Sequence, residues 1–138
     1  MIIGNINNGI VLDHIEAGKC MEIYEVLKLN ELECTVAMIK NADSVKMGKK
    51  DIIKIFEVID LDLDVIGYMA PTTTVNIIEN GKVASRKHLQ LPEKVEDVIT
   101  CKNPRCITSV ERGLKQSFKL TNREKGIYRC IYCESEAK

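Results

Sequence analysis

The sequence predicts an α+β protein of two domains, and two observations lead to that prediction. Short segments with the periodicities of strands and helices alternate through residues 1–92. Beyond them, four cysteines fall in two close pairs, Cys101-x4-Cys106 and Cys130-x2-Cys133, here called the cysteine quartet. The 138 residues suffice for one well-filled core, or for two small domains that each need additional stabilisation.

The N-terminal domain is predicted to begin with a strand, a helix and a second strand. Residues 10–15 are an apolar run that gives way to polar side chains, as at the end of a strand. Residues 17–29 repeat apolar side chains at helical spacing, and residues 33–39 indicate the second strand. We expect the polar stretch 41–48 to be a turn-rich connection.

The rest of this domain is predicted to contain a strand, a helix and a hairpin. Residues 51–59 are rich in β-branched side chains, which favour strands. A short helix should begin near Asp60 and end before Pro71, because the residue before a proline avoids the α conformation. Residues 73–87 then indicate two strands joined by Asn80-Gly81, the preferred pair of a type I′ turn. The order is βαββαβ with a terminal extension, which predicts a ferredoxin-like domain.

A short linker, Leu91-Pro92-Glu93, is predicted to separate domains at residues 1–92 and 93–138. The second domain is expected to be small and all-β, with few bulky core candidates. They are Phe118, Leu120, Ile127 and Tyr128. Burial alone cannot stabilise so small a core, so a bound metal must supply much of the folding free energy.

The charge of the chain is balanced overall but differs between its two parts. Of 20 basic and 20 acidic residues, residues 1–100 carry eleven and sixteen, and residues 101–138 carry nine and four. This mild basic excess falls short of the charge of a nucleic-acid-binding domain. No run approaches the ~20 apolar residues of a membrane span, and the start of the sequence lacks the features of a signal peptide. We therefore expect a cytoplasmic protein whose thiols stay reduced and bind metal.

The cysteine quartet predicts one structural Zn²⁺ ion. Two short loops that each offer two thiolates suit a tetrahedral ion, and four sulfur ligands leave no open position for a reactive water. Iron in a rubredoxin-like site is the chemical alternative, but four residues rather than two separate the first cysteine pair. Cys20 and Cys34 lie far from the quartet and are predicted to be buried small apolar residues.

No pattern in the chain predicts catalysis. His14 and His88 are the only histidines, and neither lies beside an obvious nucleophile. A set of polar residues on or beside predicted strands is the closest approach to a second site: Asp13, Lys54, Asn76, Arg86 and Lys87. The alternative is that these residues form a solvated strand face.

Five motifs occur in order along the chain. They are Asp13-His14; Met47-Gly-Lys-Lys-Asp51 with Lys54; Ala70-Pro-x-x-Thr-Val-Asn76; Leu91-Pro-Glu93; and the cysteine quartet. Jointly they resemble the regulatory chain of aspartate carbamoyltransferase over nearly the whole sequence. The resemblance implies a non-catalytic subunit with an N-terminal allosteric domain that binds nucleoside triphosphates and a C-terminal zinc domain that docks on the catalytic chain. It further implies that CTP, with UTP in some members, inhibits pyrimidine biosynthesis and that ATP activates it. In this family, regulatory dimers link two catalytic trimers.

The resemblance also implies roles for individual residues. Lys54 would contact the base carbonyl and the ribose, and Asp13 a ribose hydroxyl, while Lys50 matches a nearby basic residue. Arg86 takes the position of a lysine that binds the triphosphate, which keeps the charge but changes the donor geometry. The remaining pocket positions fall on Ile6, Val11, His14, Asn76, Ile78 and Val83. Gly81 stands where an aromatic residue is usual, so regulation is expected to be weaker or differently tuned.

Two alternatives stay open on the sequence. One is a zinc-ribbon protein that binds nucleic acid, against which stand the acidic first hundred residues and an aromatic content of only 4%. The other is a metabolite-sensing enzyme that would depend on Asp13, His14 and Lys54.

Overall fold

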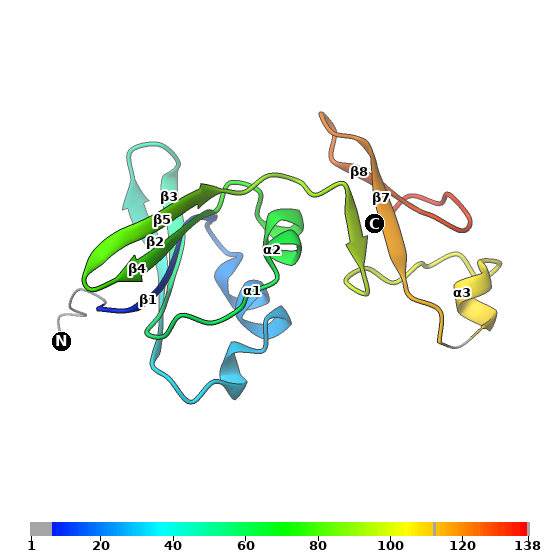
Figure 1. The fold of residues 1–138 in the computed structure, drawn as a ribbon. Coiled ribbons are helices and arrows are strands. Elements are labelled where there is room, and N and C mark those ends of the chain that lie inside the picture. Colours follow the sequence, from blue (N-terminus) through cyan, green and yellow to red (C-terminus); the bar gives the residue numbers. More distant parts are fainter. Residues whose placement is uncertain (1–6, 112, 138) are drawn as a thin grey trace. The chain divides into compact units, whose positions relative to one another are not determined.

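The structure, a computed structural model, describes residues 7–111 and 113–137, so the predicted pocket residue Ile6 lies outside the described part. The chain divides into two compact units, one up to Gln90 and one from Leu91 (Figure 1). Each unit is described by itself below.

The first unit is a five-stranded antiparallel sheet with two helices. Its strand order is β2-β3-β1-β4-β5, in which the first four strands have the ferredoxin-like arrangement and β5 is added outside β4. The predicted fold class is therefore confirmed. The elements are β1 (Gly9–Glu16), α1 (Cys20–Val26), the 3₁₀ turn η1 (Leu29–Glu31), β2 (Val36–Ser44), β3 (Gly48–Ile55), α2 (Leu63–Met69), β4 (Thr74–Glu79) and β5 (Lys82–His88).

One face of this sheet carries the hydrophobic core. Side chains alternate between the two faces of a strand, and Leu12, Ile53 and Val75 point from β1, β3 and β4 toward Ile23 of α1 and Ile66 of α2. Both helices lie on this side of the sheet (Figure 1). The residues between these core positions face the opposite side, here called the open face.

The helices begin and end where local chemistry permits. The Asp62 carboxylate caps α2 by accepting hydrogen bonds from the N–H groups of Asp64 and Val65. The first helix is shorter than the predicted 17–29, since Lys28 has a left-handed backbone conformation just beyond it. No helix in the described part of the chain is long and apolar enough to cross a membrane.

The stretch 41–48 was predicted as a connection, and that prediction is wrong for most of its length. Strand β2 continues to Ser44 and β3 begins at Gly48. The reason is a bulge, where the β2–β3 register shifts between Ile39 and Ala42 and Asn41 takes a φ of 57°. The bulge absorbs a residue and lets the polar segment pair beyond it. The hairpin prediction holds, because Asn80 and Gly81 have the positive φ values of a type I′ turn.

The second unit is a three-stranded sheet of order β6-β7-β8 with one short helix. Its elements are β6 (Lys94–Glu96), α3 (Ile107–Val110), β7 (Ser117–Asn122) and β8 (Ile127–Cys130). Phe118 and Tyr128 are buried as predicted, but Leu120 and Ile127 are only partly buried, and Val95 completes the small core. The Tyr128 hydroxyl donates a hydrogen bond to the carbonyl of Pro92, which ties the start of the unit to β8.

Candidate functional site

The cysteine quartet forms a compact cluster in the second unit. All four sulfur atoms lie within 4.8 Å of one another. The Cys101 and Cys133 sulfurs are 3.5 Å apart, and those of Cys106 and Cys130 are 3.7 Å apart. Four sulfurs placed tetrahedrally at the zinc–sulfur distance would be separated by about 3.8 Å, whereas a disulfide needs about 2.05 Å. The cluster therefore has the size of a metal site and consists of free thiols.

Two loops hold these sulfurs in place, and the Asn103 side chain links one loop to the other. In the first loop, the N–H of Cys106 donates to the carbonyl of Asn103. In the second, the N–H of Glu134 donates to the Cys130 carbonyl and the N–H of Cys130 to the Ser135 carbonyl, which folds the loop back on itself. The Asn103 amide donates to the Ser135 hydroxyl at 3.2 Å and so links the two loops.

The surroundings of the sulfurs favour thiolates at two positions. Hydrogen bonding by Ser135 lowers the pKa of Cys133 to about 6, and hydrogen bonding by Thr108 lowers the pKa of Cys106. Burial raises the pKa of Cys101 to about 12 and also raises the pKa of Cys130. An ion must therefore displace protons from Cys101 and Cys130 as it binds. With four sulfur ligands the shell is closed, so the ion is structural.

A second candidate site lies on the open face of the first unit. Strand register places Val11 of β1 between Lys54 of β3 and Asn76 of β4. On the other side of β4 lies β5, where Arg86 pairs with Asn76 and Val83 pairs with Ile78. Four strands therefore bring together residues that are distant in the sequence.

The centre of the open face is hollowed into a cavity of about 400 Å³, a volume typical of small-molecule sites. Five of the predicted site residues line it: Val11, Asp13, Lys54, Ile78 and Val83. Gly81, where the resemblance expects an aromatic residue, lines it as well, and so does Ile52, which the resemblance does not single out. Within residues 7–111 and 113–137, Lys54 has no ion-pair partner. The cavity thus has apolar walls with an acidic and a basic group.

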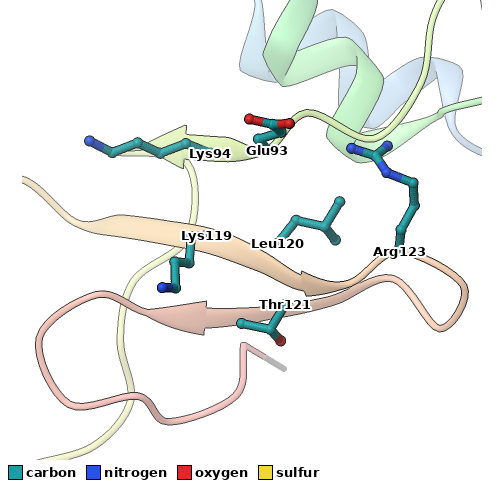
Figure 2. A pocket seen from close by; sticks show the side chains of 6 residues that line it. All are labelled: Glu93, Lys94, Lys119, Leu120, Thr121 and Arg123. Atoms are coloured by element: carbon teal, nitrogen blue, oxygen red, sulfur yellow. The ribbon is translucent and has the colours of Figure 1, made fainter.

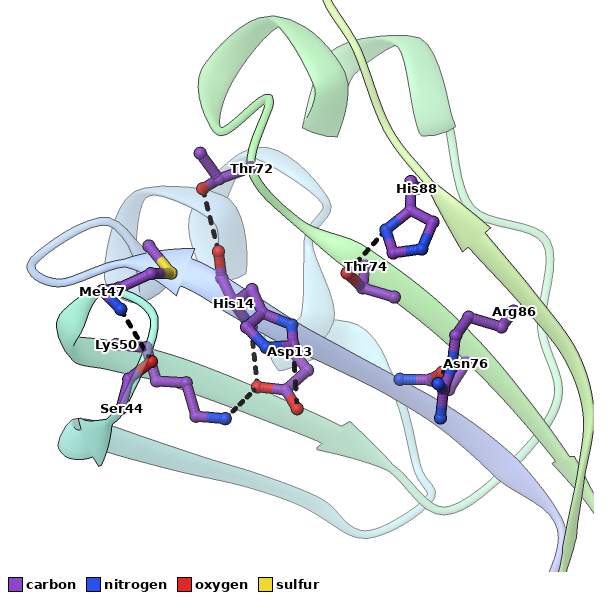
Figure 3. Close-up of polar contacts among 10 residues, drawn as sticks. All are labelled: Asp13, His14, Ser44, Met47, Lys50, Thr72, Thr74, Asn76, Arg86 and His88. Atoms are coloured by element: carbon purple, nitrogen blue, oxygen red, sulfur yellow. Dashed lines mark hydrogen bonds and ion pairs between the residues drawn. The ribbon is translucent and has the colours of Figure 1, made fainter.

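Asp13 is held by its neighbours as a charged group (Figure 3). Lys50 Nζ lies 2.9 Å from Asp13 Oδ1, and the same oxygen accepts the N–H of His14 at 2.6 Å. Burial opposes ionisation of this carboxyl, but the hydrogen bonds from Lys50 and His14 and the charges of both more than offset it, and the pKa of Asp13 falls below its ordinary value. Asp13 can therefore accept hydrogen bonds from a ligand at neutral pH.

Four of the predicted site residues flank the cavity rather than line it. His14 and Lys50 contact Asp13, while Arg86 Nε donates to Asn76 Oδ1 at 2.8 Å (Figure 3). Sequence reasoning missed Ile52, although its position between Lys50 and Lys54 on an alternating strand places it on the same face.

A further hollow of about 510 Å³ lies in the second unit, over β6 and β7 (Figure 2). Its lining is mostly polar and includes three cationic side chains. The lining residues are Glu93, Lys94, Lys119, Leu120, Thr121 and Arg123. The Arg123 guanidinium also donates to the Leu91 carbonyl at 2.7 Å, which fixes its position beside the hollow.

The fold and the two sites define a class: a two-domain protein that joins a ligand-sized cavity on a ferredoxin-like sheet to a sulfur-ligated structural metal unit. Comparison with known proteins narrows the class. Residues 1–90 match the model of the aspartate carbamoyltransferase regulatory chain, allosteric domain, and residues 93–138 match the model of its metal binding domain. The chain therefore belongs to the family of aspartate carbamoyltransferase regulatory chains.

Similar proteins with that name agree over nearly their full length. The chain is 52% identical to one from Clostridium acetobutylicum and 48% to one from Clostridium botulinum strain Hall, each over 97% of this chain and 92% of the relative. It is 46% identical to one from Bifidobacterium longum, over 100% of this chain and 99% of the relative.

These matches decide several of the predictions. The family is named for a regulatory, non-catalytic subunit, so the prediction that the chain is not itself an enzyme is confirmed. The second unit is a metal-binding domain whose four clustered cysteines hold one ion, as predicted for a single structural zinc. A zinc-ribbon nucleic-acid-binding protein is not favoured.

Proposed function

We propose that this chain binds CTP as a feedback inhibitor, with UTP, and ATP as an activator, and transmits their effect to catalytic trimers of aspartate carbamoyltransferase. In that role it controls pyrimidine biosynthesis in the cytoplasm. The observation that carries the proposal is the cavity on the open face, which combines apolar walls with Asp13 and Lys54. It lies in the unit that matches the family's allosteric domain.

The proposed contacts follow from the chemistry of the cavity. Its valine and isoleucine side chains would pack on the base, and the Lys54 ammonium would donate to a base carbonyl and the ribose. The Asp13 carboxylate, which is charged, would accept a hydrogen bond from a ribose hydroxyl. Arg86, exposed beside the cavity with Lys87 next to it, would contact the phosphates.

The zinc unit would dock on the catalytic chain. Its basic side chains Arg105, Lys115, Arg123 and Lys125 support a partner with acidic groups, and Arg112 adds a charge but lies outside the described residues. The hollow with Lys94, Lys119 and Arg123 offers such a group a concave position. A second regulatory chain would complete a dimer that links two trimers. A nucleotide that prefers one arrangement would shift the assembly by its differential affinity, typically about 1–3 kcal/mol.

Calorimetric titration of CTP and ATP into the zinc-loaded full chain tests nucleotide binding. We expect both to bind, and we expect Lys54→Met to weaken binding by at least tenfold, since it removes the unpaired ammonium. The matched control is Lys49→Met on the same strand, because Lys49 is exposed and pairs with Asp43 outside the cavity. If neither CTP nor ATP bound below millimolar concentration, the proposal would be refuted.

Size-exclusion chromatography of the chain mixed with catalytic trimers tests the docking role. Removing the ion with a thiol reagent or a chelator should release this chain from the trimers. An assembly that survives complete metal loss would show that the zinc unit does not hold the complex together.

A further inference from the structure

Asp51 is the most completely buried charged residue in the described part of the chain, with no exposed surface. Its Oδ2 accepts the N–H groups of Gly18 at 2.9 Å and Cys20 at 3.3 Å, and its Oδ1 accepts the N–H of Asn41 at 2.9 Å. A buried carboxylate costs free energy unless it is hydrogen-bonded in this way. One side chain therefore satisfies backbone groups from the segment after β1, from the start of α1 and from β2.

The backbone groups that Asp51 binds lie in or next to two β-bulges. The β1–β3 register shifts between Leu12 and Ile15, and the β2–β3 register shifts between Ile39 and Ala42. The two bulges therefore lie on opposite sides of β3, beside Asp51. Each contains a residue with a left-handed backbone, His14 with a φ of 58° and Asn41 with a φ of 57°.

Side chains on both faces of the sheet hold this double bulge. On the core face Asp51 binds the Asn41 N–H within the β2 bulge and the segment that follows the β1 bulge. On the open face its neighbour Lys50 binds Asp13 within the β1 bulge at 2.9 Å. The Thr72 hydroxyl adds a hydrogen bond to the His14 carbonyl at 2.8 Å (Figure 3).

We propose that Asp51 is a positioning residue for the ligand cavity. By holding the β2 bulge and the segment that follows the β1 bulge from the core face, it fixes the backbone from which Asp13 and His14 project, and it does so without contact with the ligand. The inference rests on the proposed function in one respect, since it takes the ligand to be a nucleotide that needs Asp13. It adds an affinity determinant on the face of the sheet that no nucleotide touches.

The test is the substitution Asp51→Asn in the zinc-loaded full chain. Asparagine has the same shape but offers one acceptor oxygen, so at least one of the backbone N–H partners loses its hydrogen bond. We expect CTP to bind about tenfold more weakly, and we expect the effect to be nearly absent when Asp13 is already Asn, because residues that act through one another are not additive. A purely destabilising effect would be additive. Ile53→Val, the next core residue on β3, controls for stability, and Asp43→Asn controls for loss of an acidic charge.

Amide NMR signals give a readout that needs no ligand. Asp51→Asn should shift the amide signals of His14 and Asn41 well beyond the shifts that Ile53→Val causes. If the wild-type chain binds CTP and Asp51→Asn binds it equally well, the inference is wrong. If the wild-type chain binds no nucleotide, the proposed function fails, and unshifted His14 and Asn41 amides would still overturn the positioning role.

A second pair of variants covers the case in which Asp51→Asn does not fold. Asn41→Gly keeps the left-handed conformation of the β2 bulge, whereas Asn41→Val disfavours it, because a β-branched residue rarely adopts a positive φ. We expect wild-type affinity for CTP with glycine and weaker binding with valine. Equal affinities in both variants would contradict a role for the bulge.

Discussion

In the first unit, eleven apolar side chains of the described residues form one buried cluster between the sheet and its helices. In the second unit, the buried apolar side chains besides cysteine are Val95, Phe118 and Tyr128 among the described residues. Burial of apolar surface contributes about 1.5–3 kcal/mol for each large side chain, so the second unit has much less to set against the entropy of ordering its chain.

The difference shows how two neighbouring domains reach stability by separate routes. The first unit depends on a contiguous core, and its polar site occupies the face that this core does not use. The second depends on an ion that joins two loops. Perturbations should therefore act on one unit and spare the other.

Removal of the ion should have the largest effect. Structural zinc in zinc-finger peptides contributes about 10–16 kcal/mol of apparent binding free energy, which exceeds anything the small core can supply. A chelator should therefore collapse the amide NMR signals of Val95, Phe118 and Tyr128 while those of Leu12 and Ile53 persist. Cys34→Ser, which alters a cysteine of the first unit, should retain the ion. If the amide signals of Phe118 and Tyr128 stayed dispersed in the metal-free chain, the second unit would not depend on the ion for its fold.

A cavity in the core of the first unit should give the next largest effect. Leu12 has no exposed surface, and Leu12→Ala should lower the free energy of unfolding of this unit by about 2–5 kcal/mol. Urea unfolding followed by first-unit NMR signals measures the loss, and zinc affinity should stay unchanged. Val45→Ala, at a fully exposed site, is the control and should be close to neutral. A parallel loss of zinc affinity in Leu12→Ala would mean that the units are not independent.

Acid should reveal the contribution of Asp51. Burial opposes ionisation of this carboxyl, but hydrogen bonds from Asn41, Cys20 and Gly18 more than offset it, so its pKa lies below the ordinary 3.8. A carboxyl with a lowered pKa in the folded state stabilises fully above its unfolded pKa, and the contribution is lost as the pH falls through the folded value. First-unit stability should therefore drop below about pH 4. In Asp51→Asn it should be lower at pH 7 and fall less steeply below pH 4, as thermal unfolding at several pH values would measure. If the stability of Asp51→Asn fell as steeply below pH 4 as that of the wild type, ionised Asp51 would not contribute to stability in this way.

Loss of a helix cap should have the smallest effect. Asp62→Ala removes the acceptor for two N–H groups at the start of α2 and should cost about 1 kcal/mol. Asp62→Asn keeps an acceptor oxygen and should cost less. Thermal unfolding of the first unit distinguishes the two variants. Equal losses of stability in both would show that the capping hydrogen bonds do not stabilise α2.

Features that depend on neighbouring residues could be predicted from the sequence. The cysteine quartet follows from spacing and sulfur chemistry, and the β4–β5 turn from the positive φ that Asn80 and Gly81 tolerate. The alternation of Lys50, Ile52 and Lys54 is likewise local, and it places all three on one face.

Features that depend on distant partners could not be predicted. Residues 41–44 look like a turn because three of the four are polar, yet they form a strand because Asp51 holds the Asn41 N–H and stabilises the bulge before them. The sequence shows Asp51 as one charged residue in a basic segment. Only the fold reveals that it is buried and that its acceptors are filled by backbone groups up to 33 residues away.

The spacing of the cysteine quartet has a consequence for synthesis. Cys130 follows Cys106 by 24 residues, and β7 lies between them. A growing chain cannot close the metal site until both loops have left the ribosome, whereas every strand of the first unit is complete by His88. At about 5–20 residues per second, the sheet has seconds in which to fold alone. The domain nearer the N-terminus should therefore fold during translation, and the zinc unit should wait for its last cysteine and for free metal.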